Sequence, residues 1–464
     1  MLLQRAKPYF IGLLLVIAII IPFLVAGYTS LNRAENAYST EQYRLAAEEY
    51  AHTARILFWR KDLYGRAGIS AAQGEDFEGA IAYFKQAKNL TEMGWVLFCQ
   101  SYAQMQDYPN TISTCKAGLQ KYQSAPLYKI LAFVYRDQKD WVAELDALKH
   151  QTQLDPNDAY AAYRLGVLMA LYAPEDSIPE LTRASSLNPE VDSAVQTLRA
   201  ALAVSSQQSD PSMQKVIVGQ AFGLVQDWEL AKTAFEQAVQ QNENNAEAWA
   251  WLGEAKQQTG QDGSAELDQA LLLDHNSVNV RALRGLYWSR KGKYSQMLAE
   301  YSLAARIEPE NPRWQASLGE AYSKIGDLVA AMAAYQRAVE LDPTQADYWR
   351  LLAIFCAENN VHAEDVGIPA AQQAYTLSPN DPASLDALGY AYLSTGRYAS
   401  AELAFSQAIE ISAQYYPAHI HLAMNYLAQG NRAAAFNALT YVRDADGAGV
   451  YAETAKQLLD KYFQ

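Results

Sequence analysis

The side chains in this sequence that could do chemistry are few and widely spaced. The chain has six histidines, which are His52, His150, His275, His362, His419 and His421. The closest two, His419 and His421, are two residues apart, and on a helix this spacing turns side chains to different faces, which disfavours a shared metal site. No His-Glu-x-x-His, Gly-x-Ser-x-Gly or Gly-x-Gly-x-x-Gly motif occurs. The motifs of zinc hydrolases, serine hydrolases and dinucleotide-binding enzymes are therefore missing, and we predict no catalytic residues, no metal and no cofactor.

The cysteines do not indicate a chemical role either. Cys99, Cys115 and Cys356 are too few for a disulfide framework, and no Cys-x-x-Cys pair is present that could bind zinc. We expect all three to be small, buried apolar residues. The many carboxylates are expected on solvated helix faces and in helix caps.

The composition indicates a large acidic protein. The chain has 464 residues, 19% of them charged, and a net charge of −14. This length exceeds one ordinary compact core, so several domains or a repeat array are expected. Binding to a nucleic-acid duplex requires a basic face, so nucleic-acid partners are disfavoured.

An uncharged apolar segment, residues 9–28, lies near the N-terminus. As a helix, a segment of this length spans ~30 Å, the thickness of the hydrocarbon core of a bilayer. Arg5 and Lys7 precede it, and positive charge is kept on the cytoplasmic side. We therefore predict a cytosolic tail over residues 1–8, a transmembrane signal anchor over residues 9–28, and a single-pass cell-membrane protein with an extracytoplasmic array. Pro22, followed by small residues, leaves open the alternative of a cleaved signal peptide and a secreted protein.

The elements that would position any functional side chain are repeated along the chain. Gly319 is followed 12, 16 and 19 residues later by Ala331, Tyr335 and Ala338, and Gly389 is followed by the same residue types at the same offsets. Small residues allow two antiparallel helices to approach closely, and the aromatic ring fills the remaining gap between them. The offsets therefore predict pairs of antiparallel helices.

Glycine and proline mark the limits of the predicted helices. A second glycine often follows the first by seven residues, as Gly326 follows Gly319, and it suits a turn with positive φ. Pro309, Pro343 and Pro379 follow second helices, which proline cannot continue. One pair cannot bury its apolar face alone, so we expect the pairs to stack around a continuous core.

This pattern resembles the tetratricopeptide repeat, a helix–turn–helix unit of 34 residues. The resemblance covers residues 34–442. It implies an all-α fold, a right-handed superhelical solenoid of antiparallel helix pairs, which the predicted transmembrane helix would precede. A polar stretch interrupts the repeats and an amphipathic helix follows them. The predicted segments after the anchor are an N-terminal array over residues 29–204, a linker over 205–212, a C-terminal array over 213–442 and a capping helix over 443–464.

The resemblance also implies a place for partners, because such arrays bind peptides or protein segments in a concave groove lined by the first helix of each pair. The slot expected to face this groove is occupied by Ile69, Phe133, Val167, Gln220, Glu254, Leu286, Glu320, Ile354, Tyr390 and Met424. None of these is asparagine or lysine, so the capture of a terminal carboxylate is not supported. The middle units, including Gln257, are polar and acidic.

The last units are apolar at the same face. We predict a partner-binding strip that consists of Ile354, Tyr390, Leu393, Ile420, Met424 and Leu427. An apolar or amphipathic segment of a partner would suit this strip. The alternative is that these side chains pack against the next helix or the cap.

Taken together, these features predict a non-catalytic, membrane-anchored scaffold that mediates protein–protein interactions at the cell envelope. The expected partners are other proteins, and no small-molecule substrate is evident. The alternative function is that of an accessory protein of envelope polysaccharide or lipopolysaccharide assembly. The lipopolysaccharide version of this alternative is disfavoured, because proteins of that type carry paired Cys-x-x-Cys motifs after their repeats and this chain has none.

Overall fold

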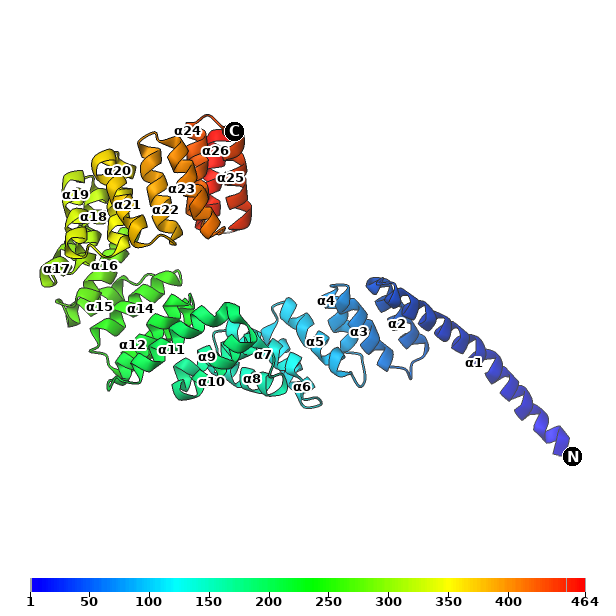
Figure 1. The fold of residues 1–464 in the computed structure, drawn as a ribbon. Helices are drawn as coiled ribbons and strands as arrows, with labels where there is room; N and C mark the ends of the chain where they lie inside the picture. Colours follow the sequence, from blue (N-terminus) through cyan, green and yellow to red (C-terminus); the bar gives the residue numbers. More distant parts are fainter. Residues whose placement is uncertain (1, 448, 464) are drawn as a thin grey trace. The chain divides into compact units, whose positions relative to one another are not determined.

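The computed structural model describes residues 2–447 and 449–463, with side chains from residue 20 onward. The secondary-structure elements of these residues are helices. The described residues form an all-α solenoid of 26 α-helices and two shorter helical turns (Figure 1). This confirms the all-α solenoid part of the predicted fold class, but not the transmembrane helix predicted to precede it. The helices divide into two compact units, residues 1–234 and residues 235–464.

The first unit consists of consecutive helix hairpins, in which each helix from α1 to α11 packs on the next one along the chain. Its elements are α1 (Leu2–Ser39), α2 (Tyr43–Ile56), α3 (Asp62–Gln73), α4 (Phe77–Phe84), α5 (Glu92–Gln104), α6 (Tyr108–Leu119), α7 (Ala125–Asp137), α8 (Trp141–Leu154), α9 (Ala159–Tyr172), α10 (Pro174–Leu187), the 3₁₀ turn η1 (Pro189–Val191), α11 (Asp192–Ser205), α12 (Pro211–Leu224) and the start of α13 (Trp228–Gln241).

The second unit also consists of helix hairpins. Its last helix, α26, packs on α25, the second helix of the preceding hairpin. Its elements are α14 (Ala246–Gln258), α15 (Ser264–Leu273), α16 (Val278–Arg290), α17 (Tyr294–Ile307), α18 (Pro312–Ile325), α19 (Leu328–Leu341), α20 (Ala346–Asn359), the π-helical turn η2 (Ala363–Gly367), α21 (Ile368–Leu377), α22 (Pro382–Ser394), α23 (Tyr398–Ile411), α24 (Tyr416–Ala428), α25 (Arg432–Ala445) and α26 (Val450–Phe463).

The predicted contact between a glycine and an aromatic ring is present in several hairpins. A Cβ atom added to Gly319 would lie 2.8 Å from the ring of Tyr335, and one added to Gly389 would lie 2.5 Å from the ring of Phe405. Only a residue without a side chain leaves room for the ring at this crossing. The 16-residue offset in the sequence therefore separates two residues that are in direct contact within the hairpin.

The turns within the hairpins use a left-handed residue followed by a helix cap. Gly326 has φ of 85°, and the next residue, Asp327, caps α19 with its side chain. In the first unit the same conformation is adopted by residues other than glycine, such as Gln106 with φ of 58°, again followed by a capping aspartate, Asp107. A left-handed backbone costs a residue with a Cβ atom about 1–2 kcal/mol, so Gln106 occupies a strained position that glycine would relieve.

Irregular repeats keep the hairpin by local adjustments. Pro179 lies inside α10 without ending the helix, and Leu181 packs on Gly166 in place of an aromatic ring. Near residue 360, where the sequence carries two extra residues, the chain forms the π-helical turn η2 before α21 begins. The extra residues are thus absorbed in a wider helical turn.

A buried ionic cluster joins the middle of the first unit to the start of α13. Arg164 of α9 donates from Nε to Oε1 of Glu144 at 2.7 Å and from Nη2 to Oε2 at 3.0 Å. Its Nη1 donates to Oδ2 of Asp227 at 2.5 Å, and Asp227 also caps α13. Trp141 lies beside the guanidinium and donates its indole hydrogen to Thr233 of α13 at 2.9 Å. Glu144 is only 1% exposed, and its ion pair with Arg164 offsets the free-energy cost of burying the carboxylate charge.

The predicted localisation as a single-pass membrane protein is wrong. Residues 9–19 of the predicted span lie outside the part of the chain whose side chains are described, as does the predicted tail over residues 1–8. At the other end of the span, Gly27 packs against Leu57, which follows α2, so the helix faces protein there. Searched over the described residues, the chain has no helix that combines the length and the apolar character needed to cross a membrane.

Candidate functional site

The six residues of the predicted apolar strip lie on three first helices of the second unit. Ile354 is on α20, Tyr390 and Leu393 are on α22, and Ile420, Met424 and Leu427 are on α24.

Much of this strip contacts the protein's own side chains. Ile420 is buried in a cluster with Leu439 of α25 and Leu459 of α26, and Met424 and Leu427 pack against that cluster. The strip therefore has fewer free apolar side chains than its sequence suggests, and its role in partner binding stays a prediction.

Tyr390, on α22, is held in place by its neighbours. Its ring stacks on His421 at 4.7 Å between centroids, and His421 Nδ1 lies 2.8 Å from Asp386 Oδ1. The half-buried tyrosine thus covers an imidazole–carboxylate pair.

The predicted acidic stretch in the middle of the chain is partly neutralised. Glu254 on α14 is buried and accepts hydrogen bonds from both terminal nitrogens of Arg290 on α16, at 2.6 and 2.7 Å. Gln257 contacts the same guanidinium at 3.3 Å. Glu320 remains exposed on α18. The interaction between Glu254 and Arg290 joins neighbouring hairpins, and this carboxylate is not presented to a partner.

A groove lies in the first unit, between α5 and α7. Its volume is about 510 Å³, which is in the usual range for a site that takes a few side chains. The apolar part of its lining includes Val96 from α5 and Ile130 and Phe133 from α7. The ring of Phe133 is 60% exposed, a large value for an aromatic residue in a concave site. The groove therefore presents an exposed apolar surface.

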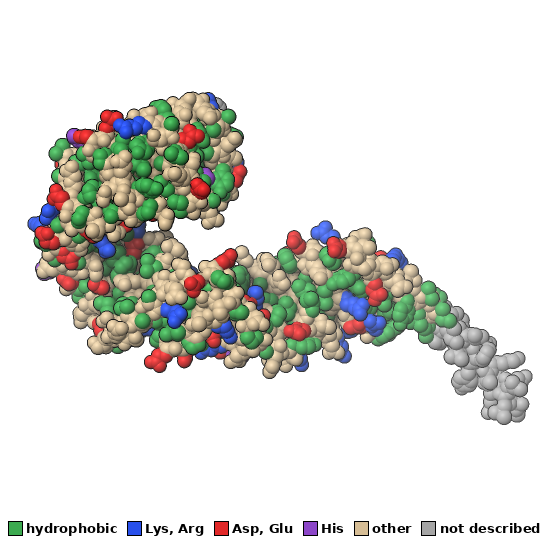
Figure 2. Space-filling model, viewed as in Figure 1, with side chains coloured by type: hydrophobic (Ala, Val, Ile, Leu, Met, Phe, Trp, Pro, Cys, Tyr) green, Lys and Arg blue, Asp and Glu red, His purple; other side chains and the backbone are tan. Residues whose placement is uncertain are grey.

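Polar side chains surround this apolar surface. Gln100 and Gln104 line the groove, and no hydrogen bond joins either amide to another side chain in the described residues. Lys129 lies 3.5 Å from Asp158 and is already paired. Tyr108, also in the lining, donates its phenolic hydrogen to Asp137 at 2.5 Å, and this bond raises the pKa of the tyrosine. The groove thus offers free amide groups beside an exposed aromatic ring. Figure 2 shows small groups of both charges among hydrophobic side chains on the visible surface.

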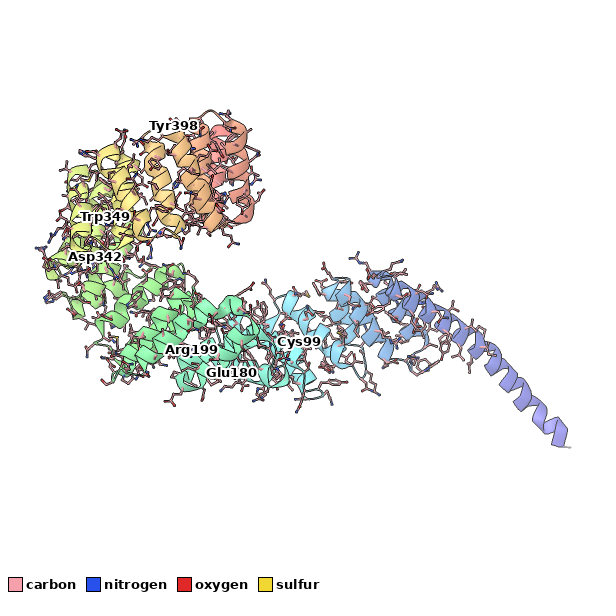
Figure 3. All side chains as sticks on the ribbon, in the orientation of Figure 1. Cys99, Glu180, Arg199, Asp342, Trp349 and Tyr398 are labelled. Atoms are coloured by element: carbon pink, nitrogen blue, oxygen red, sulfur yellow. A yellow bond between two sulfur atoms is a disulfide. The ribbon has the colours of Figure 1, made fainter. Side chains whose placement is uncertain are left out.

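A disulfide lies in the hairpin whose first helix, α5, forms one wall of this groove. Cys99 of α5 and Cys115 of α6 are both buried and are joined, with 5.4 Å between their Cα atoms (Figure 3, Cys99 labelled). Their separation of 16 residues equals the glycine-to-aromatic offset of the other repeats. The bond therefore replaces the contact between glycine and ring with a covalent one. The expectation of three unpaired cysteines was wrong for this pair, whereas Cys356 is a free, buried thiol.

The histidines are spread along the chain, and their described contacts are with different residues. His419 lies 3.0 Å from the carbonyl oxygen of Ala413, and His421 faces Asp386. Among the described residues, no three histidine, cysteine, aspartate or glutamate side chains gather as metal ligands would.

Comparison with known proteins agrees with this architecture. Models of the tetratricopeptide repeat family match residues 219–274, 290–354 and 382–415. The chain contains tetratricopeptide repeats. The repeat family thus recognises parts of the chain in which the hairpins and the glycine–aromatic contacts were observed.

Individual relatives match over limited regions. Superkiller complex protein 3 from Homo sapiens is 38% identical over 60 residues, which are 13% of this chain and 4% of that protein. Hsp70-Hsp90 organizing protein 2 from Arabidopsis thaliana is 21% identical over 207 residues, which cover 44% of this chain and 34% of that protein. Among solved structures, a tetratricopeptide repeat protein from Parabacteroides merdae is 16% identical with a TM-score of 0.45, covering 54% of this chain and 97% of that one. The chain therefore spans no more than 34% of the length of these two curated relatives.

Proposed function

We propose that the chain is a non-catalytic scaffold for protein–protein interactions and that the α5–α7 groove holds a peptide segment of a partner. The main support is Phe133, whose large exposed ring lies in a concave, mostly apolar site. Exposed apolar patches in concave sites mark interaction surfaces, and aromatic residues dominate binding energy at protein interfaces. The free amides of Gln100 and Gln104 would hydrogen-bond the polar groups of the bound segment.

The nature of the partner is suggested by two further observations. A groove between successive first helices suits the apolar face of a helix or short amphipathic segment, with its polar groups at the rim. The names of two relatives describe a complex component and an organizer of Hsp70 and Hsp90, both of which imply protein partners for those relatives. Membrane anchoring is not part of the proposal, and neither is the envelope-assembly role.

A matched pair of variants tests the groove. Phe133→Glu should abolish recovery of the specific partner, whereas Phe58→Glu should not, because Phe58 is 68% exposed in the same unit but lies outside the groove lining. Partners would be compared by affinity purification and mass spectrometry, with helical content checked by circular dichroism. Equal partner recovery by both variants would contradict the assignment of the groove.

The apolar strip of the second unit remains a proposed second contact surface. Because Leu427 packs on the core at α25 and α26, its replacement by glutamate tests this surface only if the fold survives. Leu393→Glu needs the same check of the fold, since Leu393 is half-buried on α22 and packs against the cluster that contains Phe405. Loss of a partner without loss of melting temperature would support the strip.

A further inference from the structure

The repeat that contains α4 is shorter than the others. Gly68 and Cys99 occupy equivalent positions in successive repeats and are 31 residues apart, whereas Gly285 and Gly319 are 34 apart. Correspondingly, α4 has 8 residues and ends at Phe84, while α8 has 14. The second helix of this repeat is therefore six residues shorter than α8 and stops almost two turns early. The chain from residue 85 to residue 91 then runs as a loop.

This loop opens a pocket at the edge of the array, which we call the rim pocket. Its volume is about 510 Å³, and it lies outside the α5–α7 groove. Its principal lining residues are Lys85, Leu90, Trp95, Phe98, Lys121 and Tyr122.

The apolar wall of the rim pocket is an aromatic cluster. The ring of Phe98 lies 5.2 Å from that of Phe84 and 6.2 Å from that of Trp95, measured between centroids. Tyr122 donates its hydroxyl hydrogen to the carbonyl of Leu90 at 3.1 Å and so ties the loop to the chain after α6. The wall is therefore built from two hairpins and held by a hydrogen bond.

The polar side of the rim pocket is basic. Lys85 and Lys121 both line it and are exposed, and neither forms an ion pair with a described residue. Lys85 lies 5.7 Å from the ring centroid of Tyr102. Residues 85–121 contain four lysines and only two carboxylates, whereas the whole chain has a net charge of −14. The pocket is a local positive site on an acidic protein.

We propose that the rim pocket binds a short acidic peptide segment that carries an apolar or aromatic side chain. Carboxylates of the segment would pair with Lys85 and Lys121, and the apolar side chain would pack on Trp95 and Phe98. Opposite charges placed across an interface favour the correct partner and repel like-charged ones. A long polyanion such as nucleic acid would extend from this small basic site over the acidic surface and be repelled, which favours a short peptide. The site is separate from the α5–α7 groove and extends the proposed function to a second ligand.

The test uses a synthetic peptide, Glu-Glu-Phe-Glu-Glu, blocked at both ends and labelled with an uncharged dye. Binding to the full chain is followed by fluorescence anisotropy. The Lys85→Glu/Lys121→Glu variant should bind the peptide at least about tenfold more weakly. Lys88→Glu changes the charge of an exposed lysine three residues away that does not line the pocket, so it should change the affinity by less than about threefold. Binding to the unchanged protein should weaken as salt is raised, because exposed charges are screened.

Each alternative outcome contradicts the proposal in a different way. No measurable binding by the unchanged protein would reject the site. Equal loss in the Lys88→Glu and double variants would indicate nonspecific attraction. Equal binding of Gln-Gln-Phe-Gln-Gln would show that the lysines are not used, and tighter binding of a thymidine pentanucleotide would assign the pocket to nucleic acid. Phe133→Glu should leave peptide binding unchanged, so failure of the groove assignment and failure of the rim pocket are distinguishable.

Discussion

Removing the Cys99–Cys115 disulfide should destabilise the first unit by a predictable amount. The bond closes a loop across 16 residues. Loop-closure entropy for a loop of this length corresponds to ~3 kcal/mol of stability at 25 °C. For a cooperative unit of roughly 150–250 residues, each kcal/mol shifts the melting temperature by about 2–4 °C. We therefore expect Cys99→Ala/Cys115→Ala to lower the melting temperature of the first unit by ~6–12 °C.

A second variant asks whether the bond replaces the repeat's usual contact. Cys99→Gly/Cys115→Phe rebuilds the pair of residue types seen at Gly319 and Tyr335. Burial of a phenylalanine ring contributes about 1.5–3 kcal/mol, so this variant should regain a large part of the loss.

Differential scanning calorimetry of the full chain would measure both variants, with and without a dithiol reductant. The reductant should lower the transition of the unchanged protein and leave both variants unaffected. Cys356→Ala is the control, because Cys356 lies in the second unit and should leave the first transition in place. A shift below about 1 °C in the double alanine variant, or no advantage for the glycine–phenylalanine variant, would refute the reasoning.

Three further predictions concern buried groups. Arg164→Ala leaves the buried carboxylate of Glu144 without its cation and should cost ~3–5 kcal/mol in urea unfolding, whereas Arg164→Met/Glu144→Met should recover most of that loss. Burial lowers the pKa of His419, which the hydrogen bond to Ala413 only partly offsets, so its neutral form stabilises the fold fully above pH ~6.5 and this stability is lost as pH falls through the lower folded pKa. Urea unfolding at about pH 7.5 and pH 5 should therefore show a smaller pH effect in His419→Gln. Burial raises the pKa of the Cys356 thiol to about 11, so an aromatic disulfide reagent at about pH 8 should label it only after unfolding.

The hairpins were predictable because their main contact is local in sequence. Gly319 and Tyr335 are 16 residues apart within one hairpin, and a recurring offset reports such a contact directly. The Cys99–Cys115 bond could not be predicted from the number of cysteines alone. The same offset could have revealed it, since the two cysteines occupy the glycine and aromatic positions.

The site was less predictable, because exposure depends on neighbouring hairpins. Phe133 and Val167 occupy equivalent slots, yet the first is 60% exposed and the second only 2%. Glu254 also occupies such a slot, but Arg290, 36 residues further on, covers and neutralises it. The slot position alone therefore could not single out the α5–α7 groove. The rim pocket depends on the early end of α4, which the recurring glycine and aromatic offsets do not report.

The buried cluster around Arg164 changes how the first unit should come apart under force. A solenoid with contacts only between neighbours would peel from its end, one hairpin after another, at nearly constant load. Arg164 instead joins residues 63 positions apart in the chain, and Trp141 and Thr233 are 92 apart. Pulling α13 away would therefore break contacts with α8 and α9 before α10–α12 could yield. A stretched molecule should resist at this point, and α8–α13 should then release together in a single long step.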